Sequence, residues 1–154
     1  MSWVSPIFDR TYNDVLYAIE KINEWKESAS PTTTDLKACL NYGDLNRIEG
    51  NLDYLQNEFN NVGYSITLTI KTWSDSGLPN IDDFDRIIGN ITTLYSQITT
   101  PPTMPSNMVN YEDINKMEKL IFDIKVLLED MISEYQKCGV AICGARRMLP
   151  LRRS

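Results

Sequence analysis

The sequence repeats one local pattern three times, and each copy marks a helix start. The pattern is Asn, two variable residues, Asp, an apolar residue, Asn or Asp, a base and an apolar residue, and the copies begin at Asn41, Asn80 and Asn110. An asparagine before a helix accepts a hydrogen bond from the backbone three residues on, and an acid at that position reaches back in a capping box. The pattern therefore predicts three capped helices and no catalytic chemistry.

Apolar residues at helical spacing follow each start. We expect helices over residues 41–62, 80–100 and 110–137, the last being the longest and the centre of the core. A fourth helix is expected to begin at Asp9 or Thr11 and to end by Ser30, before Pro31. Four amphipathic helices in one short chain predict a small bundle, with antiparallel neighbours where linkers are short.

The first helix resembles a degenerate fourth copy of the pattern, because Asp14 and Val15 align with Asp44 and Leu45. Any capped amphipathic helix shares part of this pattern. The asparagine, the acid and the base nevertheless recur at fixed offsets, on faces that packing does not dictate. We therefore favour a duplication of helical units, although spacings of 39 and 30 residues, from 41 to 80 and from 80 to 110, are too irregular for a solenoid.

Residues 64–73 change to a period of two. Apolar Tyr64, Ile66, Leu68 and Ile70 alternate with polar residues, which predicts a half-buried strand. A strand needs a partner for its backbone. The open candidates are the N-terminal arm at residues 3–8, the stretch around Val140 and Ile142, and another subunit.

Residues 138–144 are small, apolar and punctuated by glycine, and we expect a short strand or extended segment there, followed by a basic tail. The predicted fold is therefore mainly α: a small four-helix bundle with a short β strand or hairpin and extended termini. Two regions follow. Residues 1–137 form the bundle domain with its N-terminal arm, and residues 138–154 form an extended, glycine-containing, basic C-terminal tail.

The charge distribution is uneven. The formal net charge is −6, but residues 1–145 hold 11 bases against 21 acids, a net of −10. This balance argues against binding to nucleic acid or to an anionic membrane, and no stretch approaches the roughly 20 apolar residues of a membrane span. The basic tail can dock onto an acidic surface, including that of another copy, or can remain solvated.

The sequence gives little support for catalysis or for metal binding. The chain has no histidine, and it lacks nucleophile-elbow and phosphate-loop glycine patterns. The three cysteines, Cys39, Cys138 and Cys143, give an odd count without a repeated framework, which suits a reducing cytosol and structural thiols rather than zinc. Carboxylates cluster at helix starts, where the helix dipole explains them. We expect no enzyme activity, no cofactor and no metal site.

Several stretches together carry a resemblance to a known group of proteins. They are Asn41-Tyr42-Gly43-Asp44-Leu45-Asn46-Arg47-Ile48-Glu49, the opening Trp3 to Thr11 with Asp14-Val15, Lys71-Thr72-Trp73 before Leu78-Pro79, and the ending Leu149-Pro150-Leu151-Arg152-Arg153. In this order they resemble a helical module of tail-region proteins from phages and prophages of Firmicutes. The stretch from Ser65 to Ile70 and the pair Cys138 and Cys143 match no motif of that module.

The resemblance implies a virion structural protein of a phage tail or baseplate, or of a contractile phage-tail-like particle. Such a protein assembles in the cytoplasm of the bacterial host and works by binding other tail or baseplate subunits, with fibre adaptor as one role. It implies a homo-oligomer in the particle, without nucleic acid or membrane partners. The alternative is a receptor- or carbohydrate-binding module of the tail tip, in which aromatic side chains form a sugar platform rather than close the core.

We expect the contact surfaces on the arm, the lone strand and the tail, because strand addition between chains uses such segments. The residues predicted to make contacts are Trp3, Ile66, Leu68, Ile70, Trp73, Val140, Ile142, Arg146, Arg147, Arg152 and Arg153.

Overall fold

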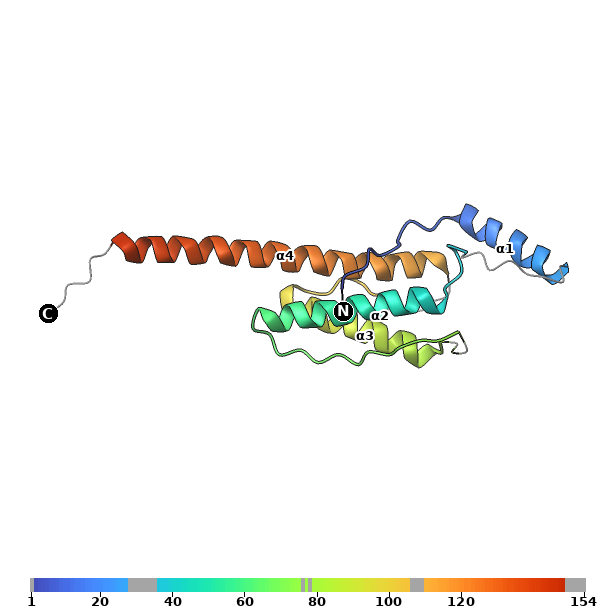
Figure 1. The fold of residues 1–154 in the computed structure, drawn as a ribbon, viewed down its shortest axis with the longest axis horizontal. Coiled ribbons are helices and arrows are strands. Elements are labelled where there is room, and N and C mark those ends of the chain that lie inside the picture. Colours follow the sequence, from blue (N-terminus) through green and yellow to red (C-terminus); the bar gives the residue numbers. More distant parts are fainter. Residues whose placement is uncertain (1, 28–35, 76, 78, 106–109, 149–154) are drawn as a thin grey trace.

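The chain is mainly helical, as the sequence predicts. The computed structural model describes residues 2–27, 36–75, 77, 79–105 and 110–148, and it describes side chains up to residue 135. Its helices are α1 (Tyr12–Glu27), α2 (Tyr42–Asn61), α3 (Ile81–Ile98) and α4 (Tyr111–Met148) (Figure 1).

The predicted capping boxes are confirmed. The Asn41 side chain accepts from the Asp44 N–H at 2.9 Å, and the Asn41 N–H donates to the Asp44 carboxylate at 3.2 Å. Asn80 and Asp83 form the same pair of bonds at 3.0 and 3.1 Å. Asn110 accepts from two backbone N–H groups of the first turn of α4. Each cap satisfies donors that the first helical turn leaves without partners.

Helices α2, α3 and α4 run parallel to one another, because all three begin at the same end of the bundle (Figure 1). Extended connections return along the bundle between them, so neighbouring helices are not antiparallel. The buried core is made by one apolar stripe from each helix and by the segment after α2. Its largest fully buried side chains are Leu45, Ile48, Leu52, Leu55, Phe59, Ile87, Ile91, Leu94, Met117, Ile121 and Ile124.

Helix α1 stands apart from this core. It lies past the end at which α2 and α4 begin (Figure 1), and Ala18 is its only buried residue. Thr11 and Asp14 cap its start with bonds of 2.7 and 3.3 Å between side chain and backbone. Apolar side chains on α1 remain exposed: Tyr12, Leu16, Tyr17 and Ile19. Three of the four helices therefore form the bundle, and α1 extends from its end.

The strand predicted over residues 64–73 is not formed, although the predicted alternation of burial is seen. Ile66 and Leu68 are buried, and the alternating residues Ser65, Thr67 and Thr69 are exposed. No β ladder forms among the described residues. The reversal after α2 occurs at Gly63, whose φ of 101° favours glycine, and the segment then runs back along α2.

Side-chain amides replace the missing partner strand. The Asn60 amide accepts from the Ile66 N–H at 2.8 Å and donates to the Ile66 carbonyl at 2.9 Å. We call such a two-bond contact an amide bracket. The four brackets of the described residues are Asn46–Trp73, Asn51–Val4, Asn60–Ile66 and Asn115–Arg10. They fix both the returning segment and the N-terminal arm, because each satisfies a backbone donor and acceptor.

The extended segment predicted over residues 138–144 is also wrong. The helix α4 continues without a break to Met148, so residues 138–148 are helical and the expected boundary at residue 137 lies inside a helix. Neither Gly139 nor Gly144 interrupts it, since glycine weakens a helix without forbidding it. Among the side chains of α4 that the structure describes, the last buried one is Leu128, and the helix projects past the ends of α2 and α3 (Figure 1).

Candidate interaction site

The structure places most of the predicted contact residues of the returning segment inside the molecule. Ile66, Leu68 and Trp73 keep only 7%, 8% and 5% of their surface exposed, and all three belong to the core. Ile70 is half-buried against the same core. These side chains close the bundle of their own chain and leave little surface for another subunit.

Trp3 is likewise engaged within the chain. Its ring meets the Tyr54 ring edge to face at a centroid distance of 5.7 Å, and the Lys125 ammonium lies 5.5 Å from its centroid. The amide bracket from Asn51 holds the next residue, Val4, on the surface of α2. The N-terminal arm is therefore a strap across the bundle, without regular secondary structure of its own.

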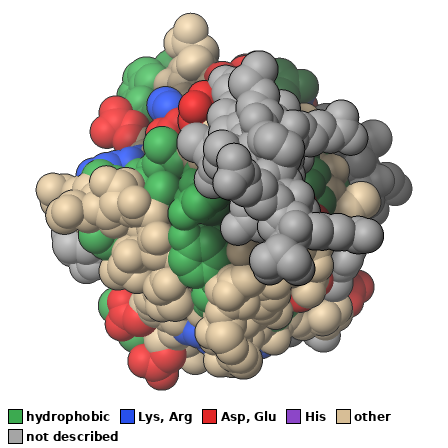
Figure 2. All heavy atoms as spheres, turned by 90° about the vertical axis from the view of Figure 1, so that its left-hand side faces the viewer, with side chains coloured by type: hydrophobic (Ala, Val, Ile, Leu, Met, Phe, Trp, Pro, Cys, Tyr) green, Lys and Arg blue, Asp and Glu red, His purple; other side chains and the backbone are tan. Residues whose placement is uncertain are grey.

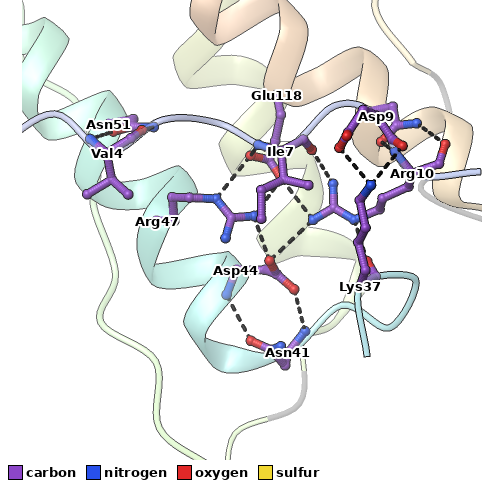
Figure 3. A network of polar contacts seen from close by, with 11 residues as sticks. Val4, Ile7, Asp9, Arg10, Lys37, Asn41, Asp44, Arg47, Asn51 and Glu118 are labelled. Atoms are coloured by element: carbon purple, nitrogen blue, oxygen red, sulfur yellow. Dashed lines mark hydrogen bonds and ion pairs between the residues drawn. The ribbon is translucent and has the colours of Figure 1, made fainter. Parts of the chain in front are cut away.

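A buried ionic cluster anchors this strap, and the sequence did not predict it. Figure 3 shows Arg10 from the arm, Asp44 and Arg47 from α2, and Glu118 from α4 converging. Arg10 Nη2 lies 3.2 Å from Asp44 Oδ1 and 3.0 Å from Glu118 Oε1. Arg47 Nη2 lies 2.5 and 2.8 Å from the same two atoms. The charges of the two positive and two negative side chains cancel, in a site from which water is largely excluded.

The backbone of the arm takes part in the same cluster. The Ile7 N–H donates to Glu118 Oε2 at 2.6 Å, and the Ile7 carbonyl accepts from Arg10 Nη1. Arg10 Nε donates to the Lys37 carbonyl at 2.8 Å, which ties the arm to the segment before α2 (Figure 3). One arginine thus joins three separate parts of the chain.

Electrostatics favour the charged form of Arg47. Burial opposes its charge, but hydrogen bonds and Coulombic attraction from Glu118 and Asp44 outweigh burial and raise the pKa of Arg47 above its usual value. The guanidinium is therefore held in its charged form. It serves as a fixed positive partner and has no proton to offer for acid–base chemistry.

A second cluster joins α2 to α3. Arg86 contacts the Glu49 carboxylate with both terminal nitrogens, at 2.5 and 3.0 Å, and the Trp73 indole N–H donates to the same carboxylate at 3.3 Å. The hydrogen bond to Glu49 raises the pKa of Arg86, against the opposing effect of burial. Arg86 also donates to the Thr69 carbonyl at 2.8 Å, so the cluster holds the returning segment as well.

Both clusters come from the repeated pattern. Arg47 and Arg86 occupy its base position, and Glu49 and Glu118 follow the capping asparagines Asn41 and Asn110 at the same offset. Because α2, α3 and α4 start at one end, these residues meet at a common level of the bundle. The offsets were visible in the sequence, but only the parallel arrangement makes them partners.

Both clusters join separate elements of the fold. The carboxylates of both clusters are paired with arginine, and no buried side-chain nitrogen or oxygen among the described residues lacks a hydrogen-bond partner. The described residues contain no group of three or more His, Cys, Asp or Glu side chains placed to hold a metal ion. None of the helices, so far as they are described, is long and apolar enough to cross a membrane.

One open apolar surface lies where α4 leaves the bundle. A depression of about 510 Å³ lies between the turn after α2 and the side of α4, lined by Val62, Gly63, Tyr64, Met131, Ile132 and Tyr135. Tyr135 is 70% exposed and Val62 is 42% exposed. Figure 2 looks onto this end of the molecule and shows a strip of hydrophobic side chains across its centre.

The remaining predicted contact residues belong to the last part of the chain. Val140, Ile142, Arg146 and Arg147 lie on the helical backbone of α4 beyond the depression. Arg152 and Arg153 lie outside the described residues, in the range 149–154. The depression and the projecting part of α4, residues 133–148, together form the candidate interaction site.

Comparison with known proteins adds no relative: no family model, no curated protein and no solved structure matches this chain.

Proposed function

We propose that the chain is a virion structural protein of a phage tail or baseplate, or of a contractile phage-tail-like particle, and that it works by protein–protein assembly. The observation that carries the assembly role is a helix that continues about 24 Å beyond its own bundle, from Ile132 to Met148 at 1.5 Å per residue. A helix that projects in this way presents surface to neighbouring subunits. The assignment to a phage tail or a related particle rests on the resemblance of the sequence to tail-region proteins.

In this proposal the bundle is a scaffold, and its two ends carry the contacts. One end presents the projecting part of α4 and the apolar depression beside it. The other end presents α1, with exposed Leu16, Tyr17 and Ile19. A subunit with apolar surface at both ends can join two neighbours, which is the role of an adaptor between a tail and a fibre.

The alternative function, binding of receptor or carbohydrate, finds less support in the site. A sugar platform needs open aromatic faces. Trp73 is buried with its indole N–H bound to Glu49, and Trp3 packs on Tyr54. Tyr64 packs edge to face on Phe59, with ring centroids 5.3 Å apart.

Affinity capture with electron microscopy tests the particle assignment. A tagged copy of the chain is expressed in an induced lysogen, purified through the tag and imaged with a gold label on the tag. We expect labelled tails or baseplates, with the host cytoplasm as the place of assembly. An uninduced culture is the control. Recovery of the free chain alone from induced cells, with unlabelled particles in the lysate, contradicts the proposal.

A further inference from the structure

The projecting part of α4 needs a partner. It contains eight consecutive residues without charge, Cys138 to Ala145, including two glycines and the β-branched Val140 and Ile142. An isolated helix of this length is marginal in water, and glycine and β-branched residues weaken it further. A helix that is apolar on all sides is normally buried. Within the chain, however, α4 has already left the bundle at this point.

We infer that the partner is a second copy of this chain, whose projecting helix lies antiparallel against the first. The inference deepens the proposed function by naming the subunit that covers the candidate interaction site, and in that respect it rests on the proposal above. The charge distribution of the projection, its length and the helix ends at the foot of the projection each support this inference.

Charge favours the antiparallel arrangement. The foot of the projection carries Glu129, Asp130 and Glu134, and its tip carries Arg146 and Arg147. Parallel packing sets acids beside acids and arginines beside arginines. Antiparallel packing sets the arginines of each copy beside the acids of the other, which stabilises the pair.

Charge also selects a register. A pair centred between Val140 and Ala141 places Arg147 level with Glu134 of the second copy, twice by symmetry. A pair centred one residue later places Arg146 level with Lys137 of the second copy, which are like charges. The first register therefore brings opposite charges to the same level at both ends of the pair. Glu134 and Arg147 lie about 140° apart around the helix axis, so their attraction acts between the ends of the two helices rather than through a direct ion pair.

The length of the projection matches this register. Met148 of one copy is then level with Ser133 of the other, so each tip ends at the foot of the other projection. This position is beside the depression lined by Met131, Ile132 and Tyr135. The pair overlaps along the whole projection and covers the apolar surface at each foot, while the two bundles remain at opposite ends.

The bundle end itself attracts a basic tip. Helices α2 and α3 terminate there, at Asn61 and Ile98, and neither has a basic residue in its last turn. The carbonyl end of a helix carries partial negative charge and favours nearby cations. Arg146 and Arg147 of the second copy supply these cations in the antiparallel pair.

Charge reversal tests the pairing directly. The full chain is expected to sediment as a dimer, and Glu134→Arg alone or Arg147→Glu alone is expected to weaken the dimer by about tenfold or more, because each brings like charges to the same level at both ends of the pair. Mixing the two variants restores association, since each reversed residue then meets an opposite charge. The matched controls, Asp85→Arg and Lys116→Glu at exposed positions of α3 and α4 within the bundle, leave association unchanged.

Circular dichroism shows that each variant is folded. The inference is overturned if the unsubstituted chain is monomeric at every accessible concentration, or if the mixture of variants associates no better than each variant alone. The assignment to a phage particle is tested independently of the pairing. Absence from labelled tails contradicts that assignment even if the purified chain forms the antiparallel dimer, and a monomeric chain found in tails contradicts only the pairing.

Discussion

Arg47 on α2 donates hydrogen bonds to both carboxylate oxygens of Glu118 on α4, from Nε at 3.1 Å and from Nη2 at 2.8 Å. The two residues are 71 positions apart in the chain. The contact exists because the two helices start at the same end of the bundle. It also places Glu118 within reach of Arg10, so that the arm, α2 and α4 share one buried charge cluster. The stability of the fold should therefore depend strongly on this single carboxylate.

Replacing Glu118 by Gln is expected to lower the free energy of unfolding by about 3–5 kcal/mol, because it leaves two buried arginines with only Asp44 to balance them. Urea unfolding followed by circular dichroism measures the loss. Glu20→Gln, an exposed substitution on α1, is the control and should stay within about 0.5 kcal/mol of the unsubstituted protein. A similarly small change for Glu118→Gln contradicts the role given to the cluster.

Asn46→Ala removes the amide bracket at Trp73 and leaves a backbone N–H and a carbonyl without their partner. We expect a loss of about 1–3 kcal/mol in the free energy of unfolding and a red shift in tryptophan emission as Trp73 becomes exposed. Asn13→Ala, at an exposed position of α1, is the matched control. Equal stability of the two variants shows that the bracket is dispensable.

Stability should fall in acid partly through Asp83. A hydrogen bond from Lys71 and the capping bond at Asn80 lower the pKa of Asp83 below its ordinary value of 3.8, against the opposing effect of burial. The folded state therefore binds this proton less tightly than the unfolded state. The stabilising contribution is present above pH 3.8 and is lost as the pH falls through the lower, folded pKa.

Asp83→Asn is therefore expected to flatten the dependence of the free energy of unfolding on pH below 3.8. Lys71→Met should flatten it in the same direction, because it removes the main cause of the lowered pKa. Urea titrations at successive pH values measure both slopes. A slope equal to that of the unsubstituted protein in both variants excludes this contribution.

A chain that ends at Lys137 should keep the bundle and lose self-association. The truncation removes no described core residue, since the core contribution of α4 ends with Met131 and Ile132. We expect its thermal unfolding to remain cooperative, with helical signal lost only for the deleted residues, and its sedimentation to be monomeric. A collapse of the remaining helical signal places residues 138–154 in the fold rather than in an interface.

The helix starts could be predicted because their causes are local. The asparagine at a cap and the acid three residues later act within one turn, so a short pattern is sufficient evidence. The same holds for the alternation of Ile66 and Leu68, which reports burial on one face. Alternation does not report what pairs with the backbone, and the amides of Asn46 and Asn60 could supply that pairing only once α2 lay beside the segment.

The buried charges could not be predicted for a related reason. The helix dipole already explains an acid at a helix start. Nothing in the sequence therefore indicated that Asp44 pairs with a distant arginine. Glu49 and Glu118 read as ordinary surface residues until the helices proved parallel. The helical state of residues 138–148 was missed because their composition is poor for an isolated helix and says nothing of the well-formed helix that leads into them.

The returning segment has a consequence for the order in which the chain folds. Its contacts with α2 join residues 6, 12, 22 and 27 positions apart, from Asn60–Ile66 to Asn46–Trp73. Each contact closes a loop at most about twice as long as the one before it, which costs little additional entropy. The segment can therefore zip back along α2 from the turn at Gly63. The contacts of the N-terminal strap with α4, across 105 and 111 positions, can form only once α4 is in place.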